Sequence, residues 1–506
     1  MNLGDVVIRA GRLFGDKVAV VDGDRSITFK ELDERSNRFA HLMANHGIKP
    51  GDSVAMLVGN SLEWFDATFG LMKAGIIRTY VNPRHTATEV EFQVSDCGAR
   101  AIIVTPEFVS MLKGADLSNV AHVIEVGPAY EAALEDCDPH HPMVDVPGDH
   151  PLEYRYTSGT TGRPKGAVHS HDGWRTLGLG QIAHMGLRDD DVILHVGPLS
   201  HGSGGIGLPM VMAGGKQIVH RVFDPVDVVE AIPRHGITTI VLVPTMIYML
   251  LDLVAERGID STSLRTILYG AAPISPQRLE RCLEIIGPVF MQTFGMSEVM
   301  GGVTFLEKAD HLPGSEKLTS CGRPSLFTQL MIADEDGNEV APGEIGEICL
   351  RGPTRLLSYL NRPEATAAAI TADGWYKSGD MARMDEQGYV YIVDRKADMI
   401  ISGGFNVYPA EVEHAIMDHP AVSEVAVVAV PDDKWGELVK AVVRLRPGME
   451  VTQDELLAWL KTHVAGYKTP RSIDFVQEEL PKNPTGKILR RQIREPYWAG
   501  RSRNVG

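Results

Sequence analysis

A dense run of hydroxyl side chains and glycines lies near residue 160. It reads YTSGTTGRPKG over residues 156–166 and includes Lys165. Glycines let backbone N–H groups approach an anion, hydroxyls donate further hydrogen bonds, and a lysine adds positive charge. This composition predicts a phosphate-binding loop, although an ordinary flexible turn has the same composition. No GxxxxGK[ST] register fits here or around Lys487, which disfavours a P-loop of the kinase or Ras type.

Six further segments carry polar or glycine-rich patterns. They are GAAP at 270–273, QTFGMSE at 292–298, WYKSGD at 375–380, DRKADM at 394–399, GGFNVYP at 403–409 and PKNPTGK at 481–487. Together with the loop at 156–166 they resemble, in the same order, the motifs of the adenylate-forming superfamily. This superfamily contains acyl-CoA synthetases, adenylation domains of peptide synthetases and luciferases. The resemblance runs through nearly the whole chain, and seven segments in the right order make it highly specific.

The resemblance implies an ATP site. Residues 156–166 would hold phosphate, residues 270–273 and 292–298 adenine and magnesium, and residues 375–380 the ribose. Asp380 would accept hydrogen bonds from both ribose hydroxyls, and Arg395 would donate to the sugar or to phosphate. The implied ATP- and AMP-binding residues are Thr157, Ser158, Gly159, Thr160, Thr161, Gly162, Lys165, Gly270, Ala271, Ala272, Pro273, Gln292, Thr293, Phe294, Gly295, Met296, Ser297, Asp380 and Arg395.

Two of these positions depart from the common family pattern. Phe294 stands where the family often has tyrosine, so the aromatic face for adenine is kept and a hydroxyl is lost. Ser297 replaces the commoner threonine and keeps a hydroxyl that can bond phosphate. We expect neither change to prevent catalysis.

The implied reaction begins with a carboxylate, which is a poor electrophile. Attack on the α-phosphate of ATP gives an acyl-AMP and pyrophosphate, and charge builds on phosphoryl oxygens that preorganised cations stabilise. The resemblance assigns Lys487 to bridging the substrate carboxylate and the α-phosphate. It assigns Glu298 to Mg²⁺, an ion that prefers one or two carboxylates plus substrate phosphates. His201, in PLSHGSGG, would line the approach of the acyl group and the thiol.

A second step would transfer the acyl group to coenzyme A. The resemblance implies that Gly403, Gly404 and Phe405 belong to a mobile loop that serves this step. It also implies that a C-terminal domain turns about Ala397, where the family commonly has aspartate or lysine. The small residues at 202–205 indicate either a roomy acyl channel or an ordinary glycine loop.

Several histidines could suggest a metal site. His169 and His171 lie two residues apart, and His140 adjoins His141. Neither pair has a cysteine partner or the HExxH spacing of zinc enzymes, so we predict no zinc.

Hydrophobic runs that alternate with helical patterns must position these residues. SVAMLVGN precedes EWFDATFGLMKAG, ARAIIV precedes EFVSMLK, TTIVLV precedes MIYMLLDLVAERG, and LRTILYG precedes SPQRLERCLEII. This alternation favours parallel sheets with crossover helices. Thr28 with Glu31 forms a capping box, and Ser275 with Pro276 supplies a helix N-cap and a first-turn proline.

The predicted fold class is therefore α/β with two domains. Residues 1–394 would form a large N-terminal AMP- and acyl-binding domain of parallel and mixed sheets. Short strands and glycine turns after about Gln329 make residues 330–394 a β-rich subdomain. Residues 395–506 would form a small, mobile α+β domain, with the boundary near Asp394. The apolar stretch at 238–255 contains Pro244 and Asp252, so it predicts a buried strand and a core helix, not a membrane span.

Composition limits the remaining choices. The chain has 506 residues, 44% of them hydrophobic and 23% charged, which is ordinary for a globular protein of several domains. The formal net charge of -17 opposes non-specific binding to nucleic acid or anionic lipid. Five cysteines without CxxC spacing indicate reduced thiols, and the N-terminal residues show no signal sequence. We expect a cytoplasmic enzyme, and the sequence sets no oligomeric state.

The favoured function is an ATP-dependent ligase that makes an acyl-CoA from a fatty, aromatic or alicyclic acid. The alternative within the superfamily is an acyl or aminoacyl adenylating enzyme that loads a carrier protein. Against it, the chain ends at Gly506 without a carrier domain, and PLSHGSGG lacks the aspartate with which amino-acid activators hold the ammonium group. A luciferase-like oxygenase shares the same motifs. A non-catalytic nucleotide-binding protein would be expected to lose some of Lys487, Glu298, Asp380 and Arg395.

Overall fold

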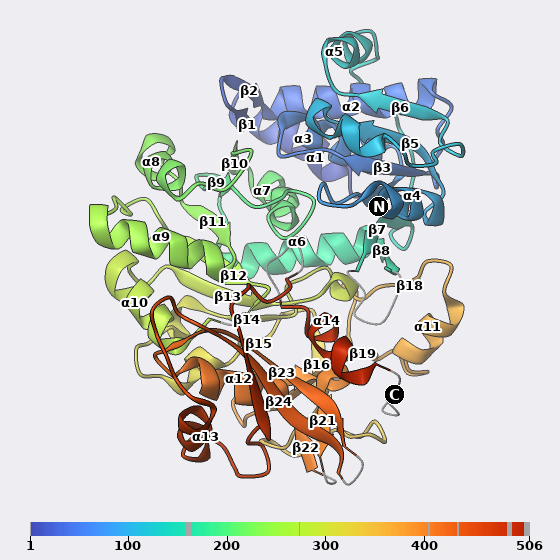
Figure 1. Ribbon diagram of the computed structural model, residues 1–506. Coiled ribbons are helices and arrows are strands. Elements are labelled where there is room, and N and C mark those ends of the chain that lie inside the picture. Colours follow the sequence, from blue (N-terminus) through green and yellow to red (C-terminus); the bar gives the residue numbers. More distant parts are fainter. Residues whose placement is uncertain are drawn as a thin grey trace. The chain divides into compact units, whose positions relative to one another are not determined.

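The computed structural model describes residues 2–157, 164–272, 274–402, 405–432, 435–482 and 488–499. Its elements are shown in Figure 1. The chain forms two compact units, which we call the N-terminal unit (Met1–Gln329 and Leu350–Tyr376) and the C-terminal unit (Leu330–Cys349 and Lys377–Gly506). Each is described by itself.

The larger sheet of the N-terminal unit has nine strands in the order β15-β14-β13-β12-β11-β9-β10-β1-β2. Neighbouring strands from β13 to β1 run parallel, as the alternating sequence pattern predicted. The strands are β1 (Val18–Asp22), β2 (Arg25–Thr28), β9 (Val192–His195), β10 (Lys216–Val219), β11 (Thr239–Leu242), β12 (Thr266–Gly270), β13 (Phe290–Phe294), β14 (Thr304–Leu306) and β15 (Arg323–Pro324).

The second sheet of this unit has seven strands in the order β18-β8-β7-β4-β3-β5-β6. They are β3 (Ser53–Leu57), β4 (Ile77–Tyr80), β5 (Ala99–Val104), β6 (His122–Glu125), β7 (Pro151–Tyr156), β8 (Gly166–Ser170) and β18 (Ser358–Tyr359). The helices of the unit are α1 (Asp5–Phe14), α2 (Phe29–Asn45), α3 (Leu62–Lys73), α4 (Ala87–Asp96), α5 (Pro128–Glu135), α6 (His171–Met185), α7 (Gly207–Ala213), α8 (Pro225–His235), α9 (Pro244–Arg257), α10 (Pro276–Ile286) and α11 (Pro363–Ala369).

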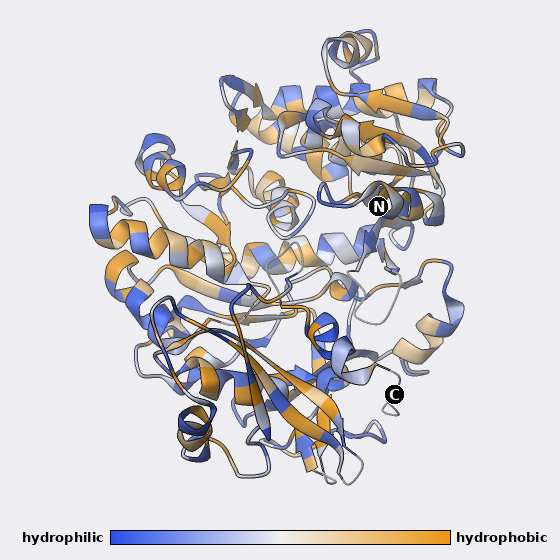
Figure 2. Ribbon diagram, viewed as in Figure 1, coloured by the Kyte–Doolittle hydropathy of each residue, from blue (hydrophilic) through white to orange (hydrophobic). Residues whose placement is uncertain are grey.

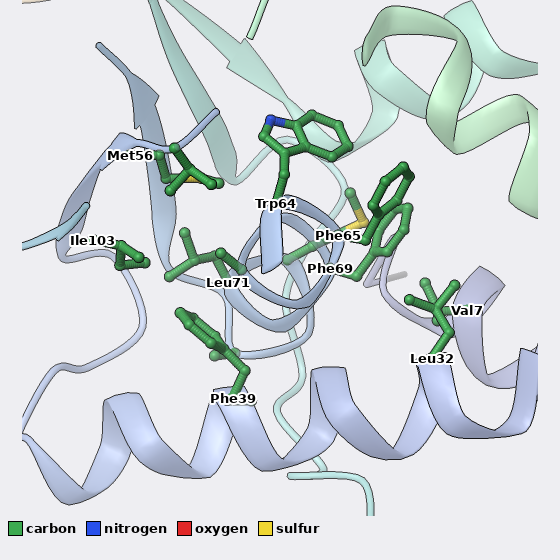
Figure 3. Packing of buried hydrophobic residues seen from close by; sticks show 14 of the residues in the cluster. Val7, Leu32, Phe39, Met56, Trp64, Phe65, Phe69, Leu71 and Ile103 are labelled. Atoms are coloured by element: carbon green, nitrogen blue, oxygen red, sulfur yellow. The ribbon is translucent and has the colours of Figure 1, made fainter. Parts of the chain in front are cut away.

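Helix α3 lies at the centre of the core. All of its residues are buried, so it has no solvent face. Figure 3 shows Trp64, Phe65, Phe69 and Leu71 pointing outward from this helix on different sides, with Phe39 of α2 facing it. These side chains belong to one buried cluster that also includes Leu199 and Met300, so distant parts of the sequence share one core.

The helix signals read from the sequence are present. Thr28 and Glu31 form a complete capping box at the start of α2. Ser275 accepts a hydrogen bond from the backbone N–H of Arg278, with Pro276 in the first turn of α10. The expected helix at EFVSMLK is a 3₁₀ helix, Pro106–Leu112, because the run is short and Gly114 follows with a positive φ of 88°.

The C-terminal unit is built around two sheets. The first has the order β16-β17-β19-β20, and the second has the order β22-β21-β24-β23, with β25 paired to β24. Figure 2 colours much of the second sheet as hydrophobic, and its strands pack against α12 and α13 in a separate core. The elements are β16 (Gln329–Ala333), β17 (Gly346–Arg351), β19 (Tyr376–Met384), β20 (Val390–Arg395), β21 (Ile400–Ser402), β22 (Phe405–Val407), β23 (Val422–Asp432), β24 (Gly436–Leu445), β25 (Ser472–Val476), α12 (Pro409–Met417), α13 (Gln453–Lys461) and α14 (Arg490–Arg494).

The apolar stretch at 238–255 forms strand β11 and helix α9, as predicted. No helix within the described residues is both long and apolar enough to cross a membrane.

Candidate active site

The predicted phosphate loop connects two antiparallel strands, β7 and β8. Tyr156 pairs with Gly166, and the backbone N–H of Thr157 donates to the carbonyl of Lys165 at 2.9 Å. The hairpin therefore fixes both ends of the loop. The predicted residues Ser158, Gly159, Thr160, Thr161 and Gly162 lie outside the described residues.

Two further predicted segments follow β12 and β13, which are parallel neighbours. Parallel strands end at the same edge of a sheet, where ligands of open α/β sheets commonly bind. Gly270 ends β12, and a Cβ there would lie 2.2 Å from the carbonyl oxygen of Thr293 on β13, so only glycine allows this approach. Ala271 has a φ of 67°, a left-handed conformation that is costly for a residue with a side chain.

The remaining residues of these segments lie on the same edge. Ala271 and Ala272 are exposed, whereas the residues from Gln292 to Glu298 are half-buried, including Thr293, Phe294, Gly295, Met296 and Ser297. The Tyr269 hydroxyl donates to Gln292 Oε1 at 3.3 Å and thereby orients this amide. Pro273 lies outside the described residues.

Glu298 lies in a short 3₁₀ helix, Ser297–Val299, that follows β13. Buried His169 donates from Nε2 to the Ser297 carbonyl at 2.7 Å, and burial lowers the pKa of this histidine to about 4. The Glu298 carbonyl accepts the Leu356 N–H at 2.7 Å. The backbone on both sides of the Glu298 side chain is therefore held in place.

The Glu298 side chain contacts a residue that the sequence did not indicate. Its Oε1 accepts a hydrogen bond from the Tyr359 hydroxyl at 3.2 Å. The Lys165 ammonium lies 5.2 Å from the centroid of the same tyrosine ring, within the range of a cation–π contact. Burial, aided by the charge of Glu298, raises the pKa of Tyr359. The predicted phosphate lysine and the predicted metal ligand thus belong to one cluster.

This cluster fits a magnesium ion that is shared with phosphate. Within the described ranges, no group of three or more His, Cys, Asp or Glu side chains could hold a metal by itself. Mg²⁺ is usually bound by one or two carboxylates together with substrate phosphates, and half-buried Glu298 supplies one carboxylate. His169 and His171 have other partners, because His171 Nδ1 accepts the Leu3 N–H at 3.1 Å.

His201 follows β9, on the same edge of the larger sheet. Its side chain is exposed to solvent, and its Nδ1 lies 2.9 Å from Ser200 Oγ. Desolvation by neighbouring groups, and further the charge of Arg155, lower its pKa to about 4. A neutral imidazole is therefore expected at physiological pH.

The small residues after His201 have different surroundings. A Cβ on buried Gly204 would lie 1.8 Å from the Leu199 carbonyl oxygen, so this glycine is required for packing. Gly205 is also buried, yet its Cβ position has no heavy atom of the described residues within 4 Å. Ser203 Oγ lies 2.8 Å from His195 Nδ1. Of the two buried glycines, Gly205 is the one beside an open space.

The predicted ribose residues pair within the C-terminal unit. Asp380 on β19 lies opposite Arg395 on β20, and their side chains form an ion pair of 2.6 Å. Asp380 is 3% exposed. Gly379 precedes it with a φ of 74°, which turns the chain and lets its N–H donate to Glu347. The geometry holds one carboxylate next to one guanidinium, as needed to bind neighbouring hydroxyls.

The predicted hinge and thioester segments also belong to this unit. Ala397 lies in a 3₁₀ turn, Lys396–Asp398. Phe405 begins β22, is 58% exposed, and its ring centroid lies 5.0 Å from that of Tyr467. Gly403, Gly404 and Lys487 lie outside the described residues.

The sequence of this chain matches two known family models. The sequence model for the AMP-binding enzyme matches residues 8–360, and the model for the AMP-binding enzyme C-terminal domain matches residues 411–487. This chain belongs to the AMP-binding enzyme family.

Relatives in this family differ in both acid and acceptor. A feruloyl-CoA synthase from Amycolatopsis sp is 38% identical, over 98% of this chain and 99% of that protein. A fatty acid–[acyl-carrier-protein] ligase, ScoC, from Streptomyces coeruleorubidus is 35% identical, over 96% and 95%. The solved structure of o-succinylbenzoate CoA synthetase from Bacillus subtilis, in complex with its acyl-adenylate intermediate, superposes with a TM-score of 0.87 at 31% identity, covering 96% of this chain and 97% of that one.

Proposed function

We propose that this AMP-binding enzyme is an ATP-dependent acyl-CoA ligase. It activates a carboxylic acid as an acyl-adenylate, releases pyrophosphate, and transfers the acyl group to coenzyme A with release of AMP. The observation that carries the proposal is the cluster of Lys165, Tyr359 and Glu298, which brings a cation from the phosphate loop and a carboxylate from the 292–298 segment to one tyrosine. Such a pair is suited to a magnesium–triphosphate.

The roles of the residues follow from their chemistry. Lys165 and the loop at 157–162 bind the phosphates. Glu298 would hold Mg²⁺, which when bound neutralises charge on the phosphoryl oxygens. The carboxylate of Asp380 accepts hydrogen bonds from the ribose hydroxyls, and Arg395 orients that carboxylate or donates to the sugar itself. Lys487 supplies positive charge where the carboxylate attacks the α-phosphate, so that the first step has a preorganised cation.

The acid and the acceptor are the finer parts of the proposal. A relative that acts on an aromatic acid and another that acts on a fatty acid support a broad class, which includes fatty, aromatic and alicyclic acids. The ScoC relative favours one second candidate, in which a carrier-protein thiol replaces coenzyme A. The neutral imidazole expected of His201 suits a position on the path of a thiol. Five buried cysteines with free thiols support a cytoplasmic location.

A panel assay tests this function. The purified chain is incubated with ATP, Mg²⁺ and either coenzyme A or a phosphopantetheinylated carrier protein, and with acids of graded length and ring content. Pyrophosphate, AMP and thioester are measured for each acid, with Lys487→Ala as the matched inactive control. We expect acid-dependent pyrophosphate release and an acyl-CoA in equal amount. Thioester formed only on the carrier protein favours the second candidate, and release of ADP in place of AMP contradicts both.

A further inference from the structure

Tyr359 has a backbone fixed by the second sheet of the N-terminal unit. It lies on β18, opposite Ala167 of β8, and β8 is the strand that directly follows the phosphate loop. Its own N–H donates to Thr366 Oγ1 at 2.9 Å, and the N–H of Leu360 donates to the Gly166 carbonyl at 2.8 Å. The side chain is only 7% exposed. The phenol therefore extends from a fixed backbone and is almost fully buried.

That hydroxyl lies between a carboxylate and a second phenol. It donates to Glu298 Oε1 at 3.2 Å and lies 3.4 Å from the hydroxyl of Tyr376, which is buried. Because its single proton goes to the carboxylate, the Tyr376 hydroxyl is the donor in the second contact. Hydrogen bonds arranged in a chain polarise one another, so the Tyr376 contact strengthens the bond to Glu298.

Glu298 needs such a partner, because a glutamate side chain has several rotatable bonds. Its backbone is held by His169 and Leu356, but those contacts do not orient the carboxylate. Partners of a metal ligand typically set its orientation, and their loss usually costs ~10- to 100-fold in metal affinity. Tyr359 Oη is the atom placed to do this for Glu298.

We propose that Tyr359 is a positioning residue for the metal carboxylate of this enzyme. Its O–H holds Glu298 Oε1 and leaves Oε2 as the oxygen that would bind Mg²⁺, while its ring supports the ammonium of Lys165. The tyrosine thereby sets the spacing between the phosphate cation and the metal ligand before substrate arrives. This inference rests on the proposed function, in which Glu298 binds the ion.

Tyr359→Phe removes the hydroxyl and keeps the ring beneath Lys165. Mn²⁺, as a spectroscopic substitute for Mg²⁺, is titrated by electron paramagnetic resonance into enzyme saturated with a non-hydrolysable ATP analogue. We expect Tyr359→Phe to weaken Mn²⁺ binding about tenfold. Affinity for the analogue measured in EDTA should change less than twofold, because the contact with Lys165 remains. Tyr391→Phe is the matched control, since it removes a hydroxyl that donates to Asp385 at 3.1 Å on another part of the chain.

Glu298→Gln separates this inference from the proposed function. If Glu298→Gln weakens Mn²⁺ binding and folded Tyr359→Phe does not, the positioning role is wrong and the metal ligand stands. If neither variant changes Mn²⁺ binding, the ion is held elsewhere, and the metal role of Glu298 and the positioning role of Tyr359 are both wrong, whereas the ligase activity is tested separately by the acid panel. The double variant should bind Mn²⁺ no more weakly than Glu298→Gln alone, because Tyr359 acts through that carboxylate. Independent, additive losses would also overturn the inference.

Discussion

Gly204 and Gly205 are consecutive buried glycines that should respond oppositely to the same change. Each is replaced by alanine in a separate variant. In Gly204→Ala the new methyl meets the Leu199 carbonyl oxygen at 1.8 Å and Trp64 Cζ2 at 2.9 Å. In Gly205→Ala it enters a space with no heavy atom of the described residues within 4 Å. Neither glycine has a positive φ, so backbone conformation does not separate the two variants.

The geometry gives the size of the difference. To reach even 3.0 Å, the Gly204→Ala contact with Leu199 must lengthen by about 1.2 Å, and a backbone oxygen moves only with its strand or loop. Overpacking of this kind typically costs ~1 to 3 kcal/mol. A glycine-to-alanine change without strain stabilises by ~0.4 to 1 kcal/mol, because the unfolded chain loses freedom. The free energies of unfolding of the two variants should therefore differ by about 1.5 to 4 kcal/mol.

Thermal melts of the two purified variants test this reasoning. We expect Gly205→Ala to melt at or slightly above the wild type, and Gly204→Ala to melt lower by roughly 1 to 4 °C. If the space beside Gly205 belongs to the acyl channel, Gly205→Leu should also shift preference toward smaller acids at unchanged ATP affinity. Equal melting temperatures for the two alanine variants would refute the packing argument, and an equal loss with every acid would refute the channel argument.

Three further outcomes are expected. Lys487→Ala should abolish pyrophosphate release from acid and ATP, a loss of ~3 kcal/mol or more in transition-state stabilisation, and should largely spare thioester formation from synthetic acyl-AMP; equal losses in both steps would contradict its role. Folded Ala397→Pro should keep one of these half-reactions within about tenfold and lose far more of the other, because proline fixes φ at the proposed pivot; two normal half-reactions would place the pivot elsewhere. Burial opposes the charge of Glu153, but Arg155 and Arg78 lower the pKa of this carboxyl to about 2. Its pKa in the unfolded chain is ~4.3. The stability that comes from the ion pairs of Glu153 is therefore present above pH ~4.3 and is lost as the pH falls toward 2. Urea unfolding across this pH range should show the loss in the wild type, and its absence would mean that Glu153 is not ionised in the fold.

The sequence predicted those parts of the fold that local patterns determine. The strands at 239–242 and 266–270, the helices after them and the capping box at Thr28 all follow from residue types within a few positions. Family membership followed from the order of short motifs. Because such signals lie within short stretches of sequence, the sequence alone was sufficient to predict these elements and the family.

Two features of the site depend on contacts that local sequence does not encode. Tyr359 meets Glu298 across 61 residues, and the pairing of β18 with β8, together with the hydrogen bond from the Leu356 N–H to the Glu298 carbonyl, brings them together. Gly204 and Gly205 are identical in sequence terms, yet one faces a carbonyl oxygen and the other an open space. The sequence shows that residues 202–205 are small. The packing role of Gly204, however, depends on Trp64 of α3 and on Leu199 in the loop that precedes the glycines.

The central position of α3 also bears on how the chain folds during synthesis. Its residues, Leu62–Lys73, leave the ribosome early, whereas the buried cluster that encloses them includes Trp174, Leu199 and Met300. At ~5 to 20 residues per second, about 10 to 50 s separate the emergence of this helix from that of its last partners. During that interval Trp64, Phe65 and Phe69 have no complete core to enter. The nascent chain therefore exposes this apolar segment until its later partners have emerged.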